Sequence, residues 1–277
     1  LLDRLGVRTR PTRMSFSVRD EVSGYEYSTH TLGALFAQPK RALDPSHWRF
    51  VRDLARLSRE AARLLARAER EPEPTLEEWL ASEGYGPELF ERFVMPLGAA
   101  IWSTSRARVR GFPARFFVRF LDNHRMLARR GKPEWRVIAG GSREYVRRLT
   151  APFRDRIRLG AAVGSVRRES GHVLVRARGA DPERFDQVVL AVHSDQALGM
   201  LQDPSQAERE ILGSIVYQQN HALLHTDARL LPKAKRARAC WNYHLLSDPE
   251  RPATLSYDMN RLQSIGAPPA NGHVIAC

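Results

Sequence analysis

The sequence predicts an α/β protein with an α+β part, in which helical and strand-rich stretches alternate along the chain. Apolar residues at helical spacing predict that residues 44–130 are largely helical. Residues 136–200 read as strand, glycine pair, helix and short strands, and end in a strand and a further helix. Stretches around 215–225, 239–246 and 253–259 predict strands of a second, mixed sheet. With 277 residues, 43% of them hydrophobic, the chain can build one large domain or two ordinary ones.

A hairpin and one long helix are predicted near the start. Apolar and polar residues alternate over 14–18 and again at Tyr25 and Tyr27, with a glycine-containing turn between them. Asp44 as N-cap and Pro45 as first helical residue predict the beginning of the helix. Its arginines lie opposite its apolar residues, at positions 52, 56, 59, 63 and 67. This stripe is most simply a solvated helix face.

Capping patterns and prolines divide the rest of the helical region. Thr75 and Glu78 form a capping-box pattern that predicts a short helix. Pro87 begins the next helix, and residues 113–127 predict a longer one that ends near Gly131.

The pattern changes after Pro133. The expected elements are, in order, strand 135–138, helix 143–153, strands 157–159, 163–166, 173–177 and 185–191, and helices 195–201 and 205–212. The run that ends at Ala191 is continuously apolar, which is typical of a parallel strand buried on both faces. Ligands of open α/β sheets bind beyond the carboxyl ends of such strands. Ala191 therefore either lets a flat cofactor approach the backbone or simply allows tight helix–sheet packing.

Gly140 and Gly141 precede a predicted helix whose first N–H groups are free to bind an anion or a polarised ring edge. The alternative is an ordinary flexible turn between a strand and a helix.

The charge of the chain leaves two kinds of partner open. Its formal net charge is +13, which suggests nucleic acid or an anionic membrane surface. The arginines are spread along the whole chain, and no nucleic-acid-binding motif accompanies them. Solvated helix faces therefore explain the charge better than nucleic acid does, while peripheral contact with an anionic membrane stays open.

Cysteine use favours a reducing compartment, and we expect a cytoplasmic protein. Cys240 and Cys277 are the two cysteines and make no disulfide framework. No Cys/His cluster has zinc-ligand spacing, so no metal site is predicted. The sequence contains no apolar run long enough to span a membrane and no signal-peptide pattern.

Several segments in a fixed order carry a resemblance to a known family. The broad match lies in residues 135–143, 157–163 and 185–191, and the narrower match lies in residues 14–18, 100–104, 193–198 and 240–243. The first set resembles the central part of the flavin-containing amine oxidase superfamily, which includes phytoene desaturases and protoporphyrinogen oxidases. The full set resembles a bacterial subgroup described as predicted NAD/FAD-binding oxidoreductases.

The resemblance implies a two-domain, Rossmann-like FAD-binding flavoprotein with a mixed sheet and a helical substrate domain. It assigns residues 1–135 and 201–277 to the substrate domain and residues 136–200 to the FAD-binding domain. It also implies that the backbone at Val163 meets the adenine of FAD. Ala191 would lie near the ADP half of the cofactor, and Gly140 and Gly141 would lie on the flavin side.

Two family features are not found in the sequence. No G-x-G-x-x-G fingerprint occurs, and the C-terminal segment that closes over the flavin is not recognised. We therefore expect an internal piece of a longer protein that, on its own, holds FAD weakly and is inactive.

Substrate residues are predicted more weakly. Polar and aromatic groups that follow apolar stretches are candidates for a substrate pocket, namely Trp102, Asn123, His124, Trp241 and Tyr243. Core packing is the alternative for each of them. No catalytic side chain is assigned, because the flavin itself accepts the hydride in this class. His193 is either a general base or a residue that caps or packs against the strand end.

The expected function is FAD-dependent oxidation of a small molecule, either an amine or a lipid-like acyl or isoprenoid substrate. The alternatives are a non-enzymatic basic protein that binds nucleic acid or an anionic membrane, and an inactive fragment.

Overall fold

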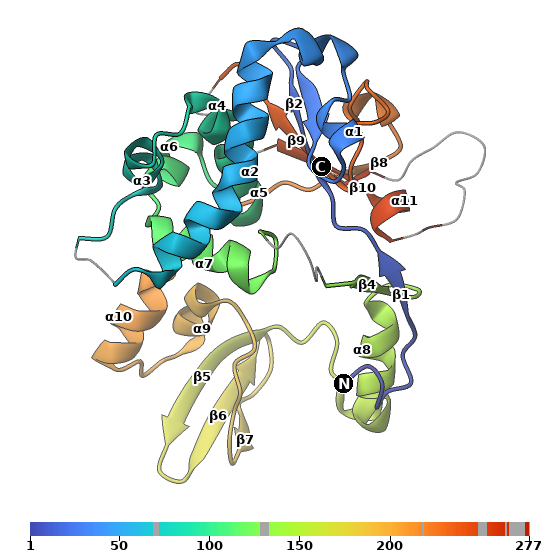
Figure 1. The fold of residues 1–277 in the computed structure, drawn as a ribbon. Coiled ribbons are helices and arrows are strands. Elements are labelled where there is room, and N and C mark those ends of the chain that lie inside the picture. Colours follow the sequence, from blue (N-terminus) through green and yellow to red (C-terminus); the bar gives the residue numbers. More distant parts are fainter. Residues whose placement is uncertain are drawn as a thin grey trace. The chain divides into compact units, whose positions relative to one another are not determined.

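The computed structural model describes residues 1–68, 72–127, 133–217, 219–248, 254–263, 265 and 275–276 (Figure 1). The chain divides into two compact units. The large unit comprises Leu1–Val146 and Asn220–Cys277, and the small unit comprises Arg147–Gln219.

The large unit contains a six-stranded mixed sheet. Its strands, from one edge to the other, are β3 (Glu26–Ser28), β2 (Phe16–Asp20), β9 (Trp241–Leu245), β10 (Thr254–Asp258), β11 (Ile275–Ala276) and β8 (Leu224–His225). β2 runs parallel to β9, with Phe16 opposite Trp241, and the other pairs are antiparallel. The predicted hairpin and the strands expected around 239–246 and 253–259 are confirmed. The strand expected around 215–225 is shorter than predicted, since Leu224–His225 is the only strand among the described residues of that stretch.

The helices of the large unit include those predicted to begin at Pro45, after Thr75 and at Pro87. They are α1 (Leu32–Leu35), η1 (Pro39–Leu43), α2 (Pro45–Ala66), α3 (Leu76–Ser82), α4 (Pro87–Leu89), η2 (Phe90–Val94), α5 (Met95–Trp102), α6 (Arg106–Arg110), α7 (Ala114–Asn123) and α11 (Met259–Leu262). The Asp44 carboxylate accepts the Ser46 N–H at 2.9 Å, and Thr75 and Glu78 form the expected capping box. The helix predicted over 113–127 is shorter, and Gly131, its predicted end, lies outside the described residues.

The core of the large unit forms where α2 meets the strands and the other helices. Phe50, Leu57 and Leu64 of α2 are buried, and Phe50 packs edge-to-face on Tyr27 with ring centroids 5.0 Å apart. The opposite face of α2 carries the predicted arginine stripe. Ion pairs there join Arg49 to Glu88, Arg52 and Arg56 to Asp53, Arg59 and Arg63 to Glu60, and Arg67 to Glu83. These arginines are therefore engaged by carboxylates of the same chain, which weakens the nucleic-acid alternative.

A two-stranded sheet and a glycine turn close the first segment of the large unit. β1 (Thr9–Thr12), which the sequence did not suggest, pairs antiparallel with the predicted strand β4 (Trp135–Ile138). The Gly-Gly turn follows, and α8 (Arg143–Thr150) begins three residues after Gly140. The helix expected to reach residue 153 ends earlier. A 3-10 turn, η3 (Ala151–Arg156), follows because Pro152 has no N–H to extend the α-helix.

The small unit is a three-stranded antiparallel sheet with two helices. Its elements are β5 (Val163–Glu169), β6 (His172–Ala177), β7 (Glu183–Phe185), α9 (Ser194–Met200) and α10 (Gln206–Ser214). α9 is anchored on β5, since the Gln202 N–H donates to the Val166 carbonyl at 2.9 Å. Ser205 and Glu208 form a capping box that begins α10 as predicted.

Two strand predictions in this region are wrong. Residues 157–159 form no strand. The buried parallel strand 185–191 is also not formed, because β7 ends at Phe185 and Val189 is 89% exposed. A strand buried on both faces needs strands beside it and helices on both faces. The described residues provide no strand partner for this run beyond Phe185.

Candidate functional site

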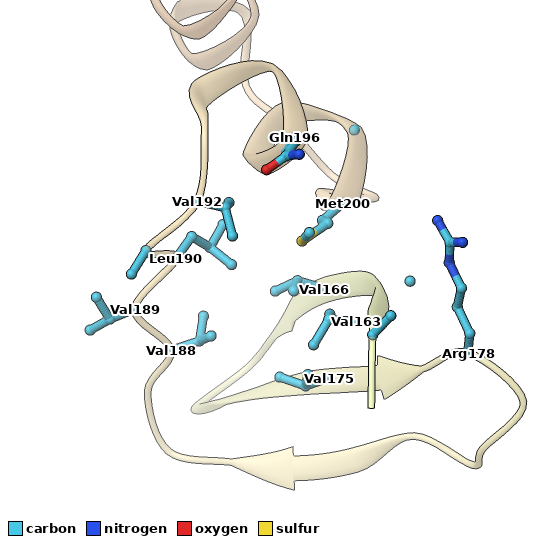
Figure 2. A pocket seen from close by; sticks show the side chains of 14 residues that line it. Val163, Val166, Val175, Arg178, Val188, Val189, Leu190, Val192, Gln196 and Met200 are labelled. Atoms are coloured by element: carbon cyan, nitrogen blue, oxygen red, sulfur yellow. The ribbon is translucent and has the colours of Figure 1, made fainter. Parts of the chain in front are cut away.

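A cavity of about 670 Å³ lies within the small unit (Figure 2). Val163 on β5 and Ala191, in the extended segment before α9, both line it, so two predicted cofactor residues share one cavity. Most of its wall is apolar, with Val166, Val175, Leu190, Val192 and Met200 among the lining side chains. Figure 2 shows the valines of the sheet pointing toward Met200 and Gln196 of α9.

Local irregularity of β5 shapes one end of this cavity. The register with β6 shifts between Val163 and Ser165, which leaves Gly164 as the extra residue of a β-bulge. A Cβ at Gly164 would lie 3.3 Å from Cγ of Arg178, so a side chain here would push on that arginine. The bulge therefore places a bare backbone and the Arg178 side chain at the edge of the cavity.

The chemistry of the lining fits the adenosine end of FAD. Aliphatic walls suit a flat heteroaromatic ring, and a few polar groups suffice to orient a ligand in such a pocket. Gln196 and Arg178 are the polar side chains that line it, and no carboxylate is among the described lining residues. Such a lining would tolerate both an adenine ring and nearby negative charge.

Gly140 and Gly141 lie in the large unit, in the turn between β4 and α8. Their φ angles are +87° and +84°, a conformation that favours glycine. The Gly141 N–H donates to the Ile138 carbonyl, and the Gly141 carbonyl accepts the Glu144 N–H. Glu144 places a negative charge in the first turn of α8, which disfavours a second anion there. This observation favours the strand-to-helix turn over an anion site.

A second cavity, of about 410 Å³, lies within the large unit. His124 and Trp241, two of the predicted substrate residues, line it. Phe16, Phe93 and Leu97 line it as well, and all three are buried. The cavity therefore lies between the sheet, the α5 helix region and the end of α7.

The other three predicted substrate residues are not among the described residues that line this cavity. Trp102 packs among the rings of Phe112, Phe116, Phe117 and Phe120. Tyr243 is buried, with its hydroxyl 3.8 Å from the sulfur of Met95, and burial raises its pKa to about 12. Asn123 is the exposed last residue of α7. The positions of Trp102 and Tyr243 favour the core-packing alternative.

The sequence did not single out several residues that line the large-unit cavity. Trp135, His30 and Arg125 line it but come from three distant segments. No spacing in the sequence connects them, because Trp135 begins β4, His30 follows β3 and Arg125 follows α7. Arg125 has a φ of +54°, which no local sequence signal suggests for an arginine.

His193 lies at the N-cap of α9 in the small unit. Its ring stacks on Tyr217 with centroids 4.0 Å apart, and its Nδ1 lies 4.0 Å from a carboxylate oxygen of Asp195. It does not line the small-unit cavity, and its side chain makes no capping hydrogen bond, so its stacking on Tyr217 favours a packing role over the general base.

Two further features are absent from the described ranges. These residues contain no group of three or more His, Cys, Asp or Glu side chains arranged to hold a metal ion. Among the same residues, no helix is both long enough and apolar enough to cross a membrane.

Several solved structures of longer proteins have a fold similar to that of this chain. A redesigned putrescine oxidase matches with a TM-score of 0.58 at 13% identity, over 99% of this chain and 59% of its own length. A fatty acid isomerase from P. acnes that produces CLA matches with a TM-score of 0.58 at 18% identity, over 99% and 60%. The cyclohexylamine oxidase of Brevibacterium oxydans matches with a TM-score of 0.52 at 14% identity, over 99% and 59%. These matches confirm the predicted fold class, and the chain spans about three fifths of the length of each structure.

The family comparison rests on the sequence. No curated protein matches the chain. A family model described as flavin containing amine oxidoreductase matches residues 1–260. The chain therefore belongs to the flavin-containing amine oxidoreductase family, which confirms the predicted superfamily and its cofactor, FAD.

Proposed function

We propose that the protein is an FAD-dependent oxidoreductase that removes a hydride from an amine or a lipid-like substrate. The observation that supports this most directly is that Val163 and Ala191 both line the small-unit cavity. The two positions were assigned to the adenine and the ADP half of FAD separately, from different segments. The aliphatic lining of the cavity suits that end of the cofactor.

The proposal assigns residues 136–200 to the FAD-binding domain, and residues 1–135 and 201–277 to the substrate domain. FAD, when bound, would supply the two-electron acceptor. The valines around Val163 would exclude water from the adenine end. Gly140 and Gly141, which present no side chains, would let the backbone approach the flavin side.

The large-unit cavity is the proposed substrate cavity. His124 and Trp241 line it, and its buried floor would orient an apolar substrate and keep water out. The fold alone does not choose the substrate, since the similar structures include two amine oxidases and a fatty acid isomerase. Amines and lipid-like substrates are therefore both to be tested.

The proposed function includes a cellular location and a contact with anionic membranes. We propose a cytoplasmic protein, because only two cysteines are present and Cys240 is a buried free thiol. Peripheral contact with an anionic membrane would follow from the net charge of +13. Co-sedimentation with anionic vesicles at low salt, lost at high salt, is the expected result. Retention that is equal on neutral vesicles would contradict it.

The experiment is an absorbance spectrum of the protein purified from its full-length gene. Blue absorption bands released as FAD on denaturation, and bleaching of these bands by an amine or an acyl donor without oxygen, are expected. A colourless, folded protein that takes up no added FAD would overturn the proposal.

A further inference from the structure

One charged side chain lines the cavity of the small unit. Arg178 is the only Arg, Lys, Asp or Glu among the described residues of its lining, and most of the wall is aliphatic. Two other arginines of this unit are paired with carboxylates, Arg158 with Glu183 and Arg168 with Asp203. No residue that the structure describes forms a hydrogen bond or an ion pair with the guanidinium of Arg178. That guanidinium is therefore available to a ligand of the cavity.

The position of the Arg178 side chain is set by its own backbone and by Gly164. The Arg178 N–H donates to the carbonyl of Ala162, the residue before Val163, at 2.8 Å. A Cβ at Gly164 would lie 3.3 Å from Cγ of Arg178, so the missing side chain leaves room for the stem of the arginine. Figure 2 shows this stem rising from the sheet in the direction of α9. The guanidinium therefore lies at the end of the cavity that Val163 lines.

The adenine and the phosphates are the two parts of FAD that a guanidinium at this cavity could meet. The proposed function assigns Val163 to the adenine and Ala191 to the ADP half. Figure 2 shows Leu190 and Val192 on the side of the cavity opposite Arg178. Ala191 lies between these two residues in the sequence, whereas Arg178 adjoins Val163. The adenine is therefore the part of the cofactor that the guanidinium would meet.

Adenine and a guanidinium suit each other in shape and in solvation. A guanidinium is planar and more weakly hydrated than an ammonium, and it stacks on aromatic faces, including those of nucleobases. The aliphatic walls, to which Val166 and Val175 belong, contact a ring through dispersion alone. Arg178 is the charged lining residue that adds an electrostatic attraction to the face of the ring.

We propose that the guanidinium of Arg178 stacks on the adenine of FAD, which makes Arg178 a cofactor-binding residue. The inference rests on the proposed function in one respect, that the small-unit cavity holds the adenosine end of FAD. Stacking needs the plane of the guanidinium, whereas attraction to a phosphate needs only the charge and is screened by salt. The two roles therefore differ in their response to lysine and to salt.

The test is a titration of FAD into the full-length protein stripped of its flavin, followed by the change in flavin fluorescence. Arg178→Ala should weaken FAD binding about fivefold, the effect of losing one stacked guanidinium. Arg178→Lys keeps the charge and should weaken binding nearly as much, because an ammonium has no plane to stack. Raising the salt from about 0.05 to about 0.5 M should change these ratios by less than about twofold.

Arg176→Ala is the matched control, since it removes an exposed arginine of β6 that is not among the lining residues. It should bind FAD as the parent does. An Arg178→Ala variant that binds FAD as tightly as this control would overturn the inference. An Arg178→Lys variant that binds like the parent would also overturn it and would assign the guanidinium to a phosphate. In both cases a parent that binds FAD leaves the proposed function standing, whereas a parent that takes up no FAD would overturn the function and the inference together.

Discussion

The hydroxyl of Tyr27 donates a hydrogen bond to the backbone carbonyl of Arg92, and so joins strand β3 to the helical run from Pro87 to Trp102. Pro96 follows four residues after Arg92 and has no N–H, so it cannot donate to that carbonyl as an α-helical residue would. Tyr27 is fully buried, and burial raises its pKa well above the ordinary value. The strand thus supplies a donor to this carbonyl, which Pro96 cannot do.

Removing this hydroxyl should destabilise the large unit. Tyr27→Phe keeps the ring that packs on Phe50 but leaves the Arg92 carbonyl without its tyrosine donor. We expect a loss of about 1–2 kcal/mol in the free energy of unfolding, measured by urea titration. Tyr145→Phe, on the half-exposed face of α8, is the control and should change stability by less than about 0.5 kcal/mol. Equal effects of both variants would contradict this role for Tyr27.

Helix beginnings could be predicted from the sequence because capping is local. The side chains of Asp44 and Thr75 accept hydrogen bonds from N–H groups no more than three residues further on. A stretch of four residues therefore contains the whole interaction. The parallel pairing of β2 with β9 could not be predicted in the same way. Phe16 and Trp241 lie opposite each other although they are 225 positions apart in the sequence, and no local pattern encodes that pairing.

The residues of the two cavities also differ in whether the sequence could predict them. Val163 and Ala191 were assigned through family resemblance, and the structure brings them to one cavity. Arg125 was missed because a left-handed arginine has no signature in sequence, and only the hydrogen bonds of Leu121 and Asp122 reveal it. The apolar run before Ala191 was read as a buried strand because composition reports apolar character but not whether neighbouring strands are present.

The glycine turn before α8 gives a prediction about backbone strain. Gly140→Ala and Gly141→Ala should each cost about 1–2 kcal/mol, since both positions have positive φ. Gly140→Ala should cost more, because its Cβ would lie 3.0 Å from Cγ of Glu144, while Gly141 has open space. Gly33→Ala, in α1 without positive φ, is the control and should be neutral or stabilising. Thermal unfolding of the three variants gives the order, and a neutral Gly141→Ala would refute the strain argument.

Arg168 makes the small unit sensitive to acid. Its guanidinium bonds Asp203 at 2.9 Å and Glu208 at 2.8 Å, joining β5 to α10. The bond from Arg168, with those from Ser205, lowers the pKa of Glu208 to about 2, from an ordinary value of 4.5. A lowered carboxyl pKa contributes stability that is complete above the unfolded value and is lost as pH falls through the folded value. The small unit should therefore lose stability between about pH 4.5 and pH 2.

The Arg168→Gln variant tests this assignment. It should be less stable than the parent at neutral pH and should show a flatter pH dependence in the same window, measured by hydrogen exchange of residues 147–219. Arg167→Gln, which removes the neighbouring pair with Glu169, is the matched control. It should leave the slope of the parent unchanged, whereas a parental slope in Arg168→Gln would assign the acid sensitivity to other carboxylates.

Ala191 provides the sharpest test of where the cofactor lies. The residue is exposed and lines the small-unit cavity, so Ala191→Trp should fill part of the cavity without disturbing a packed core. In the full-length protein we expect FAD affinity to fall at least tenfold, which corresponds to about 1.4 kcal/mol. Leu159→Trp adds the same ring at a 90% exposed position outside the cavity lining and should bind FAD normally. If Ala191→Trp retained FAD as tightly as this control, the adenine end would lie elsewhere. The family's flavin cofactor would be unaffected, because that conclusion rests on the match over residues 1–260 and not on this cavity.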